Sequence, residues 1–140
     1  MNRKDQIAEA ISTIMPKIAR HITLGMAQVF HLTPPQVFTI LLIGSQPACR
    51  ACDLSQALRV SAPTVTGIID RLERAGYVKR VPSKTDRRVI HIELTQTGMK
   101  FDRQIRNHVK KQWRLLLDKL SDRDCEAYLD IMERLQNQIG

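Results

Sequence analysis

The chain has 140 residues, of which 43% are hydrophobic, and it carries a formal net charge of +8 at pH 7. This length corresponds to about one domain with its own core, and no stretch approaches the ~18 apolar residues that a helix needs to cross a bilayer. Three cysteines, an odd number, argue against a disulfide framework, and the N-terminus lacks the apolar run of a secretory signal. We therefore expect a cytoplasmic protein with a single domain over residues 1–140 and no membrane partner.

The N-terminal region, residues 5–30, carries isoleucine every three or four positions, which is typical of an amphipathic helix. Pro16 lies inside this region and predicts a kink, because proline removes one helical hydrogen bond and clashes with the preceding turn. The alternating spacing resembles a coiled-coil seam and favours a dimer interface, while packing within one subunit remains the alternative. The stripe consists of Ile7, Ile11, Ile14, Ile18 and Ile22.

Two short helices are expected next, over residues 33–43 and 51–58. The first begins with Thr33-Pro-Pro-Gln36, a capping box with proline in the first turn, and its nearly all-apolar surface predicts burial. The second begins after Arg50, which is a poor capping residue. The turn Arg59-Val60-Ser61 follows, and we expect Val60 to anchor it in the core.

The segment from Ser61 to Ala75 has the start, the stripe and the stop of a helix. Ser61 is a good N-cap, Pro63 suits the first turn, and Gly76 can end the helix in the left-handed conformation. The surface opposite the apolar stripe is small and rich in hydroxyls near the N-terminus, so it can approach base edges and phosphates. The apolar stripe consists of Val65, Ile68, Ile69 and Leu72.

A basic hairpin is predicted directly afterwards. The runs Val78–Pro82 and Val89–Thr95 are prone to form strands, and the polar turn Ser83–Asp86 lies between them. In the second run, Ile90, Ile92 and Leu94 are expected on one face and His91 and Glu93 on the other. The tip carries cations that can enter a narrow minor groove: Lys84, Arg87 and Arg88.

The C-terminal third is expected to hold two more helices. Thr95 caps the first, which extends to about Leu120, and Ser121 with Asp124 resembles a capping box for the last one. Both helices have apolar stripes, as does the N-terminal region. Residues 1–30 and 96–140 are therefore expected to serve as dimerisation helices.

The positive charge is concentrated around the predicted helix and hairpin. Residues 59–88 hold eight Lys and Arg against three Asp and Glu, whereas residues 1–58 and 89–140 have net charges of only +2 and +1. This placement favours double-stranded DNA as the partner, because cations neutralise phosphates, and a generic solvated basic face is the alternative. The residues expected to bind DNA are Ser61, Pro63, Thr64, Thr66, Arg71, Lys84, Arg87 and Arg88.

These elements predict a mainly α-helical chain with a small β-hairpin wing (α+β), in which residues 33–95 form a winged helix-turn-helix. The sequence resembles the MarR family of bacterial and archaeal transcriptional regulators in the lead-in DLSQALRVS (Asp53–Ser61), in Pro63–Val78, and in the residues Asp86–Arg88 and Leu94–Gly98. The combined motif is specific, and the resemblance covers nearly all of the chain.

The resemblance implies a homodimeric regulator, expected to be a repressor, on a pseudo-palindromic operator. The helix matching Ser61–Ala75 would enter the major groove, and Arg88 would reach the minor groove. Two such helices would lie about 34–36 Å apart along the duplex. A small aromatic or phenolic effector is also implied, although the sequence does not name its pocket. Gly67 departs from the family, because many members carry a larger or basic residue there.

Two other functions are left open by the residues. Cys49 and Cys52 form a C-x-x-C at a helix start, where the helix dipole can lower the pKa of a thiol, so a redox-sensing protein is one alternative. No βαβ context surrounds the motif, and the first helix lacks the cysteine that redox-sensing members of the resembled family use. A winged-helix interaction module without sequence readout is the other alternative. We expect no metal, cofactor or enzyme activity, because neither further ligands at zinc-finger spacing nor a catalytic grouping appears.

Overall fold

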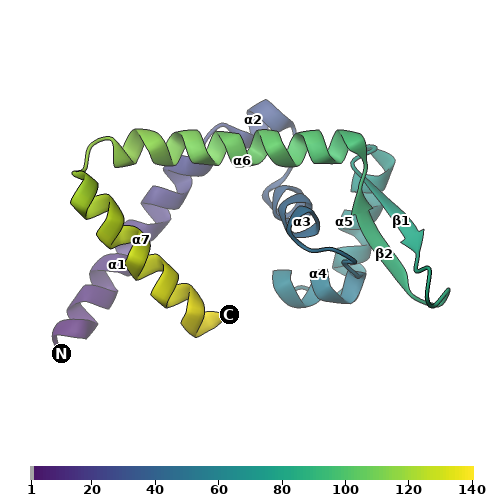
Figure 1. The fold of residues 1–140 in the computed structure, drawn as a ribbon, viewed down its shortest axis with the longest axis horizontal. Coiled ribbons are helices and arrows are strands. Elements are labelled where there is room, and N and C mark those ends of the chain that lie inside the picture. The colour runs from purple at the N-terminus through teal and green to yellow at the C-terminus, as the bar shows by residue number, and fades with distance from the viewer. Residues whose placement is uncertain (1) are drawn as a thin grey trace. The chain divides into compact units, whose positions relative to one another are not determined.

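The computed structural model describes residues 2–140. The fold over these residues is mainly helical with a two-stranded antiparallel sheet, as the sequence predicts. The chain forms two compact units: one is Leu24–Asn107, and the other joins the segment up to Thr23 to His108–Gly140. In chain order (Figure 1), the elements are α1 (Arg3–Thr23), α2 (Met26–Phe30), α3 (Pro34–Ser45), α4 (Ala51–Leu58), α5 (Ala62–Arg74), β1 (Val78–Pro82), β2 (Ile90–Leu94), α6 (Gln96–Leu117) and α7 (Asp122–Ile139).

The N-terminal helical region is interrupted once, between α1 and α2, and the kink predicted at Pro16 stays a prediction. Helix α1 runs through Pro16 without interruption, and the break before α2 comes at Gly25, whose φ is 87°. Glycine adopts this left-handed conformation without steric cost, so it is the natural point for the chain to leave the helix. Among residues 2–140 no single helix is long and apolar enough to cross a membrane, although Arg3–Phe30 and Pro34–Ser45 meet those limits when they are counted together.

Helix α3 begins as predicted and lies at the centre of the Leu24–Asn107 unit. The Thr33 hydroxyl accepts from the Gln36 backbone N–H at 3.4 Å, and the Gln36 side chain accepts from the Thr33 N–H at 2.9 Å, which completes the capping box. Val37, Ile40 and Ile43 are buried. The prediction of burial all round is wrong at Phe38, which is 52% exposed.

Helices α4 and α5 form the helix-turn-helix with the predicted bounds. As predicted, the Arg50 side chain is a poor cap and makes no capping hydrogen bond at the start of α4. The Arg50 backbone N–H instead donates to the carboxylate of Asp53 at 2.8 Å. In the turn, Arg59 adopts a left-handed conformation with φ 53°. Val60 is only half-buried, so it anchors the turn less deeply than predicted, and its carbonyl oxygen accepts from the Ser55 hydroxyl at 2.7 Å.

The hairpin formed by β1 and β2, called the wing below, pairs Val78 with Leu94 at its base and Pro82 with Ile90 near its tip. The backbone N–H of Ile92 donates to the carbonyl oxygen of Cys49 at 2.7 Å, which attaches β2 to the segment before α4. Of the residues predicted to share one face of β2, Ile92 is buried and Ile90, near the tip, is 49% exposed.

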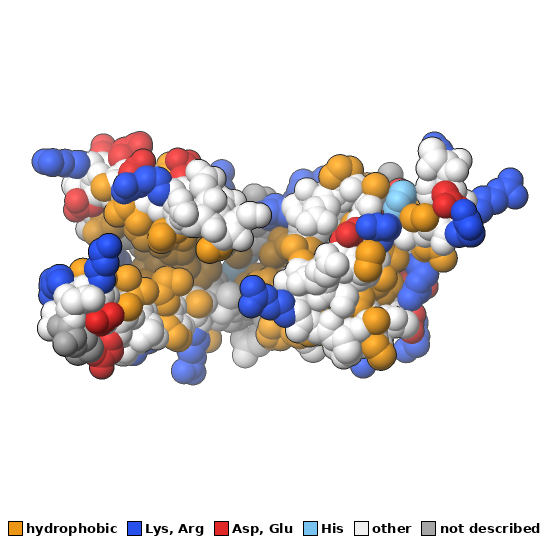
Figure 2. Space-filling model, turned by 90° about the horizontal axis from the view of Figure 1, so that it is seen from below, with side chains coloured by type: hydrophobic (Ala, Val, Ile, Leu, Met, Phe, Trp, Pro, Cys, Tyr) orange, Lys and Arg blue, Asp and Glu red, His pale blue; other side chains and the backbone are white. Residues whose placement is uncertain are grey.

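Helices α6 and α7 carry the predicted caps, although α6 ends at Leu117 rather than Leu120. The Thr95 hydroxyl accepts from the Gly98 backbone N–H at 3.0 Å, and the Ser121 hydroxyl accepts from that of Asp124 at 3.2 Å. In the unit that contains α1 and α7, large hydrophobic side chains gather at the surface (Figure 2). On these two helices the exposed ones are Ile7, Ile11, Ile14, Met15, Tyr128, Leu129, Ile131, Met132, Leu135 and Ile139.

Candidate nucleic-acid interface

Helix α5 is buried along its apolar side and presents hydroxyl groups at its exposed N-terminus. Its apolar stripe, predicted from spacing alone, is buried throughout, with exposed fractions of 0–5%. On the other side, the Ser61 hydroxyl accepts from the Thr64 backbone N–H at 3.3 Å and lies 2.8 Å from the Thr64 hydroxyl. Ser61, Pro63, Thr64 and Thr66 are all exposed. A helix end with free N–H groups and short polar side chains is suited to a phosphate or a base edge.

Arg71 lies farther along the same helix and is exposed. A Cβ atom built at Gly67 would lie 3.8 Å from Nη2 of Arg71, so the guanidinium group passes beside the glycine. The surface at Gly67 is otherwise open, and the small residue leaves that cation close to the helix surface.

The wing tip has an ordered turn that places its cations outward. The Ser83 hydroxyl accepts from the backbone N–H groups of Thr85 and Asp86 at 3.3 and 3.4 Å, and Ser83 is nearly buried. The Asp86 carboxylate accepts from both the backbone N–H and Nε of Arg88, at 3.0 and 3.3 Å. The Arg88 side chain is nevertheless 92% exposed. The Asp86 carboxylate thus holds Nε of Arg88, while the rest of the guanidinium group is exposed to solvent.

All the residues that the sequence predicted to bind DNA lie in one unit, Leu24–Asn107, and all are exposed. They belong to α5, from its cap Ser61 to Arg71 in its last turn, and to the tip of the wing. Helix α5 and the first strand of the wing are joined by a short segment in which Gly76 has φ 86°. Lys84 and Arg87 accompany Arg88 on the tip.

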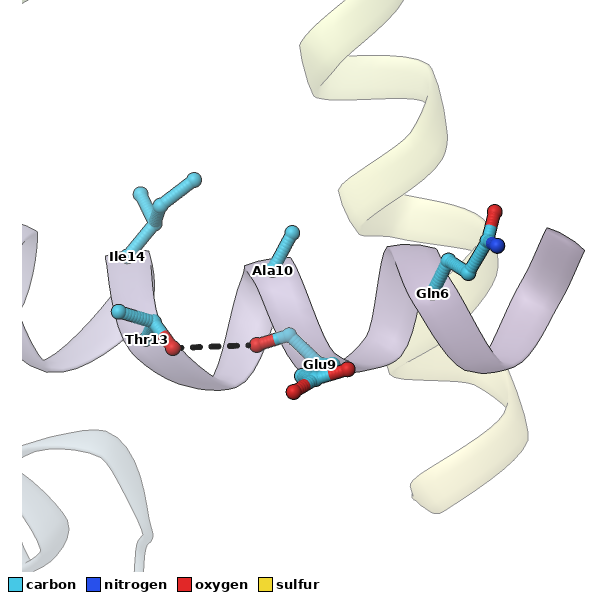
Figure 3. Close-up of a pocket in the computed structure, with 5 residues that line it drawn as sticks. All are labelled: Gln6, Glu9, Ala10, Thr13 and Ile14. Atoms are coloured by element: carbon cyan, nitrogen blue, oxygen red, sulfur yellow. Dashed lines mark hydrogen bonds between the residues drawn. The ribbon is translucent and has the colours of Figure 1, made fainter. Parts of the chain in front are cut away.

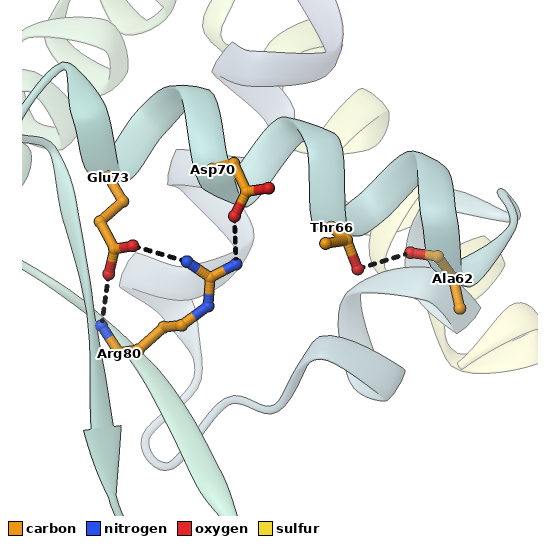
Figure 4. Close-up of polar contacts among 5 residues, drawn as sticks. All are labelled: Ala62, Thr66, Asp70, Glu73 and Arg80. Carbon is orange, nitrogen blue, oxygen red and sulfur yellow. Dashed lines mark hydrogen bonds and ion pairs between the residues drawn. The ribbon is translucent and has the colours of Figure 1, made fainter.

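One arrangement of charged side chains was not predicted from the sequence. Arg80 of β1 reaches α5, where Nη2 donates to Asp70 at 2.6 Å and Nη1 donates to Glu73 at 2.6 Å (Figure 4). The Arg80 backbone N–H also donates to the other Glu73 oxygen, at 3.2 Å. Hydrogen bonding to Asp70 is the largest of the effects that raise the pKa of Arg80, so the cation is permanent. Two acidic residues three apart on a helix, followed by a cation on the next strand, were the available signal.

The two cysteines of the C-x-x-C motif differ in their surroundings. Cys49 is 1% exposed, and burial raises the pKa of its thiol, with a further contribution from the charge of Asp53. The expectation of a lowered pKa at this helix start is therefore wrong for Cys49, because burial and the charge of Asp53 both raise the pKa of its thiol. Cys52 is exposed. Reactive thiols are thiolates with access to solvent, so Cys49 does not have the character of a redox sensor.

The described residues do not group ligands for a metal ion, and the hollow along α1 is not enclosed. Within 2–140, no three or more His, Cys, Asp or Glu side chains are grouped so that they could hold a metal ion. A shallow hollow of about 450 Å³ lies along α1 (Figure 3), where the Thr13 hydroxyl donates to the Glu9 carbonyl oxygen at 3.2 Å. All of its lining residues come from that single helix, so it is an open groove and not an enclosed ligand site. They are Gln6, Glu9, Ala10, Thr13 and Ile14.

Comparison with known proteins agrees with this geometry. Residues 32–90 match the model of the MarR family. The chain is 33% identical over 103 residues to the HTH-type transcriptional regulator PapX of Escherichia coli, covering 71% of this chain and 60% of PapX. It is 31% identical over 81 residues to the HTH-type transcriptional regulator YfiV of Bacillus subtilis, covering 56% of this chain and 51% of YfiV. The chain thus spans between half and three fifths of the length of these two relatives.

Solved structures extend the likeness over the whole chain. A MarR family protein from Bacillus stearothermophilus superposes with a TM-score of 0.88 at 19% identity, covering 99% of this chain and 98% of that one, which shows the fold. FabT of Streptococcus pneumoniae, solved in complex with DNA, superposes with a TM-score of 0.77 at 26% identity, covering 97% and 96%. The family match over residues 32–90, the curated relatives and the winged helix-turn-helix agree, and together they identify a MarR-type helix-turn-helix segment within this chain.

Proposed function

We propose that this protein is a sequence-specific regulator of transcription that binds double-stranded DNA. The observation that carries the proposal is the pairing, in one compact unit, of the exposed hydroxyl-bearing start of α5 with an exposed arginine on an ordered wing. A helix of this kind fits the major groove, where base edges present a distinct pattern of donors and acceptors. An extended basic tip fits the adjacent minor groove.

The charge distribution supports the same partner. Residues 59–88 carry a net charge of +5, and they include both α5 and the wing. Phosphate neutralisation by such a surface supplies sequence-independent affinity, while hydroxyl and guanidinium groups in the grooves supply discrimination between sequences. FabT, a similar structure at 26% identity, was solved in complex with DNA, which supports this assignment.

We further propose that the protein acts as a homodimer on a pseudo-palindromic operator. The apolar side chains exposed on α1 and α7 belong to one compact unit. Proteins seldom leave so many large apolar residues of two helices in contact with water, and a second copy of the chain would cover them. Two α5 helices related by a two-fold axis would then read successive major grooves.

Repression and response to a small effector are part of the proposal. A curated relative, 27% identical over 105 residues, is the homoprotocatechuate degradative operon repressor of Escherichia coli, which supports repression. A small aromatic or phenolic molecule would release DNA by binding one of two dimer conformations more tightly, since only differential affinity shifts such an equilibrium. Its relatives bear the names of regulators, and we propose no enzymatic activity.

The central test is selection of bound fragments from random duplexes, followed by titration of the selected duplex and a scrambled duplex at the same salt concentration. Specific binding predicts an affinity ratio of about 10³ or more. Equal affinities for the selected and the scrambled duplex would favour the alternative, a winged-helix interaction module without sequence readout. Footprinting of the selected duplex should show two protected half-sites about one helical turn apart.

A further inference from the structure

Arg80 connects the two elements that the proposed function assigns to different grooves of DNA. It lies on β1 of the wing, and its guanidinium group spans Asp70 and Glu73 of α5. Both distances are 2.6 Å, and the Arg80 backbone N–H adds a third contact to Glu73. Only 31% of the Arg80 side chain is exposed, compared with 92% for Arg88 at the tip. Arg80 is therefore engaged mainly in contacts within the protein, whereas Arg88 projects into solvent.

We propose that Arg80 is a positioning residue, which fixes the angle between the wing and α5 and thereby sets the specificity of DNA binding. The inference rests on the proposed function, because it concerns how two DNA-binding elements are held in register. Asp70 and Glu73 are its partners in this role. None of the three residues needs to contact a base for the effect.

The need for such a clamp follows from the connection between the elements. Only Ala75, Gly76 and Tyr77 separate α5 from β1, and Gly76 is in the left-handed conformation. The wing tip lies about six residues beyond this joint, a lever of about 20 Å at ~3.3 Å per strand residue. A rotation of about 10° would move the tip by about 3.5 Å, which is roughly one base-pair step of DNA. A small change at the joint would therefore shift Arg88 to the neighbouring base pair.

Arginine suits this role because its planar fork can hold two carboxylates at once. A lysine at position 80 would keep the charge but would present one ammonium group on a flexible chain, which cannot reproduce the two-ended geometry. Arg80→Lys therefore separates charge from geometry, since the net charge of the protein does not change. Lys79→Arg is its matched control, because Lys79 is the neighbouring residue on β1 and makes only an exposed pair with Glu93 at 3.9 Å.

For a second variant, the electrostatic and the geometric explanations predict different results. Asp70→Asn with Glu73→Gln removes two negative charges beside a polyanion, so electrostatics alone predicts tighter binding to every duplex. The clamp predicts tighter binding to scrambled duplex but a lower ratio of specific to scrambled affinity. The two accounts thus predict different changes in the ratio.

The experiment measures this ratio for the full chain, using the duplex selected with the wild-type protein and a scrambled duplex at fixed salt. We expect Arg80→Lys and the double variant to lower the ratio about tenfold, comparable to one mismatched base pair, and Lys79→Arg to leave it unchanged. Partial unfolding of a variant would reduce both affinities equally, so the ratio reports geometry and not stability. Minor-groove footprints flanking the half-sites should weaken in the clamp variants.

The outcomes separate the two proposals. If the wild type discriminates between the duplexes and Arg80→Lys discriminates equally well, the clamp is refuted while the proposed function stands. An equal rise in both affinities for the double variant would refute it too. If the wild type shows no preference for any duplex, the proposed function fails, and this inference fails with it.

Discussion

The hydroxyl of Thr95 donates to the carbonyl oxygen of Gly76 at 2.6 Å, which joins the residue before α6 to the residue that ends the α5 region. The Thr95 backbone N–H donates to the carbonyl oxygen of Tyr77 at 3.0 Å, at the same joint. The same hydroxyl also accepts from the Gly98 backbone N–H. The base of the wing is therefore fixed by short contacts to the start of α6, in addition to the Arg80 clamp on its other side.

This close packing predicts that Gly98→Ala destabilises the fold. A Cβ atom at Gly98 would overlap the carbonyl oxygen of Tyr77, and a backbone atom in a fixed turn cannot move aside as a flexible side chain would. We expect a loss of about 1–3 kcal/mol in the free energy of unfolding, measured by urea denaturation. Gly67→Ala is the control, because its Cβ meets only Arg71 at 3.8 Å. It should gain about 0.5–1 kcal/mol, since alanine favours a helix interior. Equal effects of the two substitutions would contradict the packing argument.

Arg88→Ala should weaken binding to the selected duplex and lower the slope of log affinity against log salt by roughly one unit. Arg88 projects from the tip with only its base held by Asp86. Arg114→Ala removes a cation of similar exposure from α6, where it pairs with Asp118 at 2.9 Å, and should leave the slope unchanged. Titrations at several salt concentrations provide the measurement. An unchanged slope for Arg88→Ala would exclude a phosphate or groove contact.

The apolar faces of α1 and α7 predict a change of oligomeric state on substitution. Ile11→Glu and Leu129→Glu each place a charge on a large apolar residue that is about half exposed, at 50% and 53%. Burying an unpaired carboxylate in a dimer interface is costly, so light scattering should detect monomers. Ser12→Glu introduces the same charge at an exposed position next to Ile11 and should remain dimeric. Monomeric wild-type protein at micromolar concentration would refute the proposed dimer.

The cysteines should differ sharply in reactivity. In the native protein, a disulfide-forming thiol reagent should modify Cys52 quickly and Cys49 very slowly, because Cys49 is 1% exposed and burial raises the pKa of its thiol. In denaturant the two thiols should react alike. Peptide mapping after a timed reaction distinguishes them. Rapid formation of a Cys49–Cys52 disulfide with peroxide in the folded protein would revive the redox alternative.

Asp53 should contribute stability that depends on pH. The backbone N–H of Arg50 donates to its carboxylate, and this hydrogen bond is the main reason that the pKa of Asp53 is lowered. A lowered pKa in the folded state stabilises the fold at pH values above the ordinary carboxyl pKa and loses this effect as the pH falls through the folded value. Asp53→Asn should therefore be less stable than wild type at pH 7, and thermal unfolding curves should converge as the pH falls below the folded-state pKa of Asp53. A difference that grows toward acid would be contrary to this assignment.

The sequence was most informative where the signals are local. The bounds of α4 and α5, the Thr33 capping box and the Ser61 cap were all predicted from adjacent residues. The buried stripe of α5 follows from helical spacing, because 3.6 residues per turn place Val65, Ile68, Ile69 and Leu72 on one side. The exposure of the eight candidate DNA-binding residues follows as well, since they lie on the opposite side or on the hairpin tip.

Only the tertiary structure shows which residues from distant parts of the sequence are in contact. Arg80 holds Asp70 and Glu73 across the joint between β1 and α5, and Cys49 is covered where Ile92 of β2 bonds to its carbonyl oxygen. The interruption of the N-terminal helical region at Gly25 was not predicted from the local pattern either. Caps and stripes depend on neighbours within one or two helical turns, so the sequence determines them. A thiol's burial or a guanidinium's partners depend on which distant segments pack together, and only the folded chain brings those segments into contact.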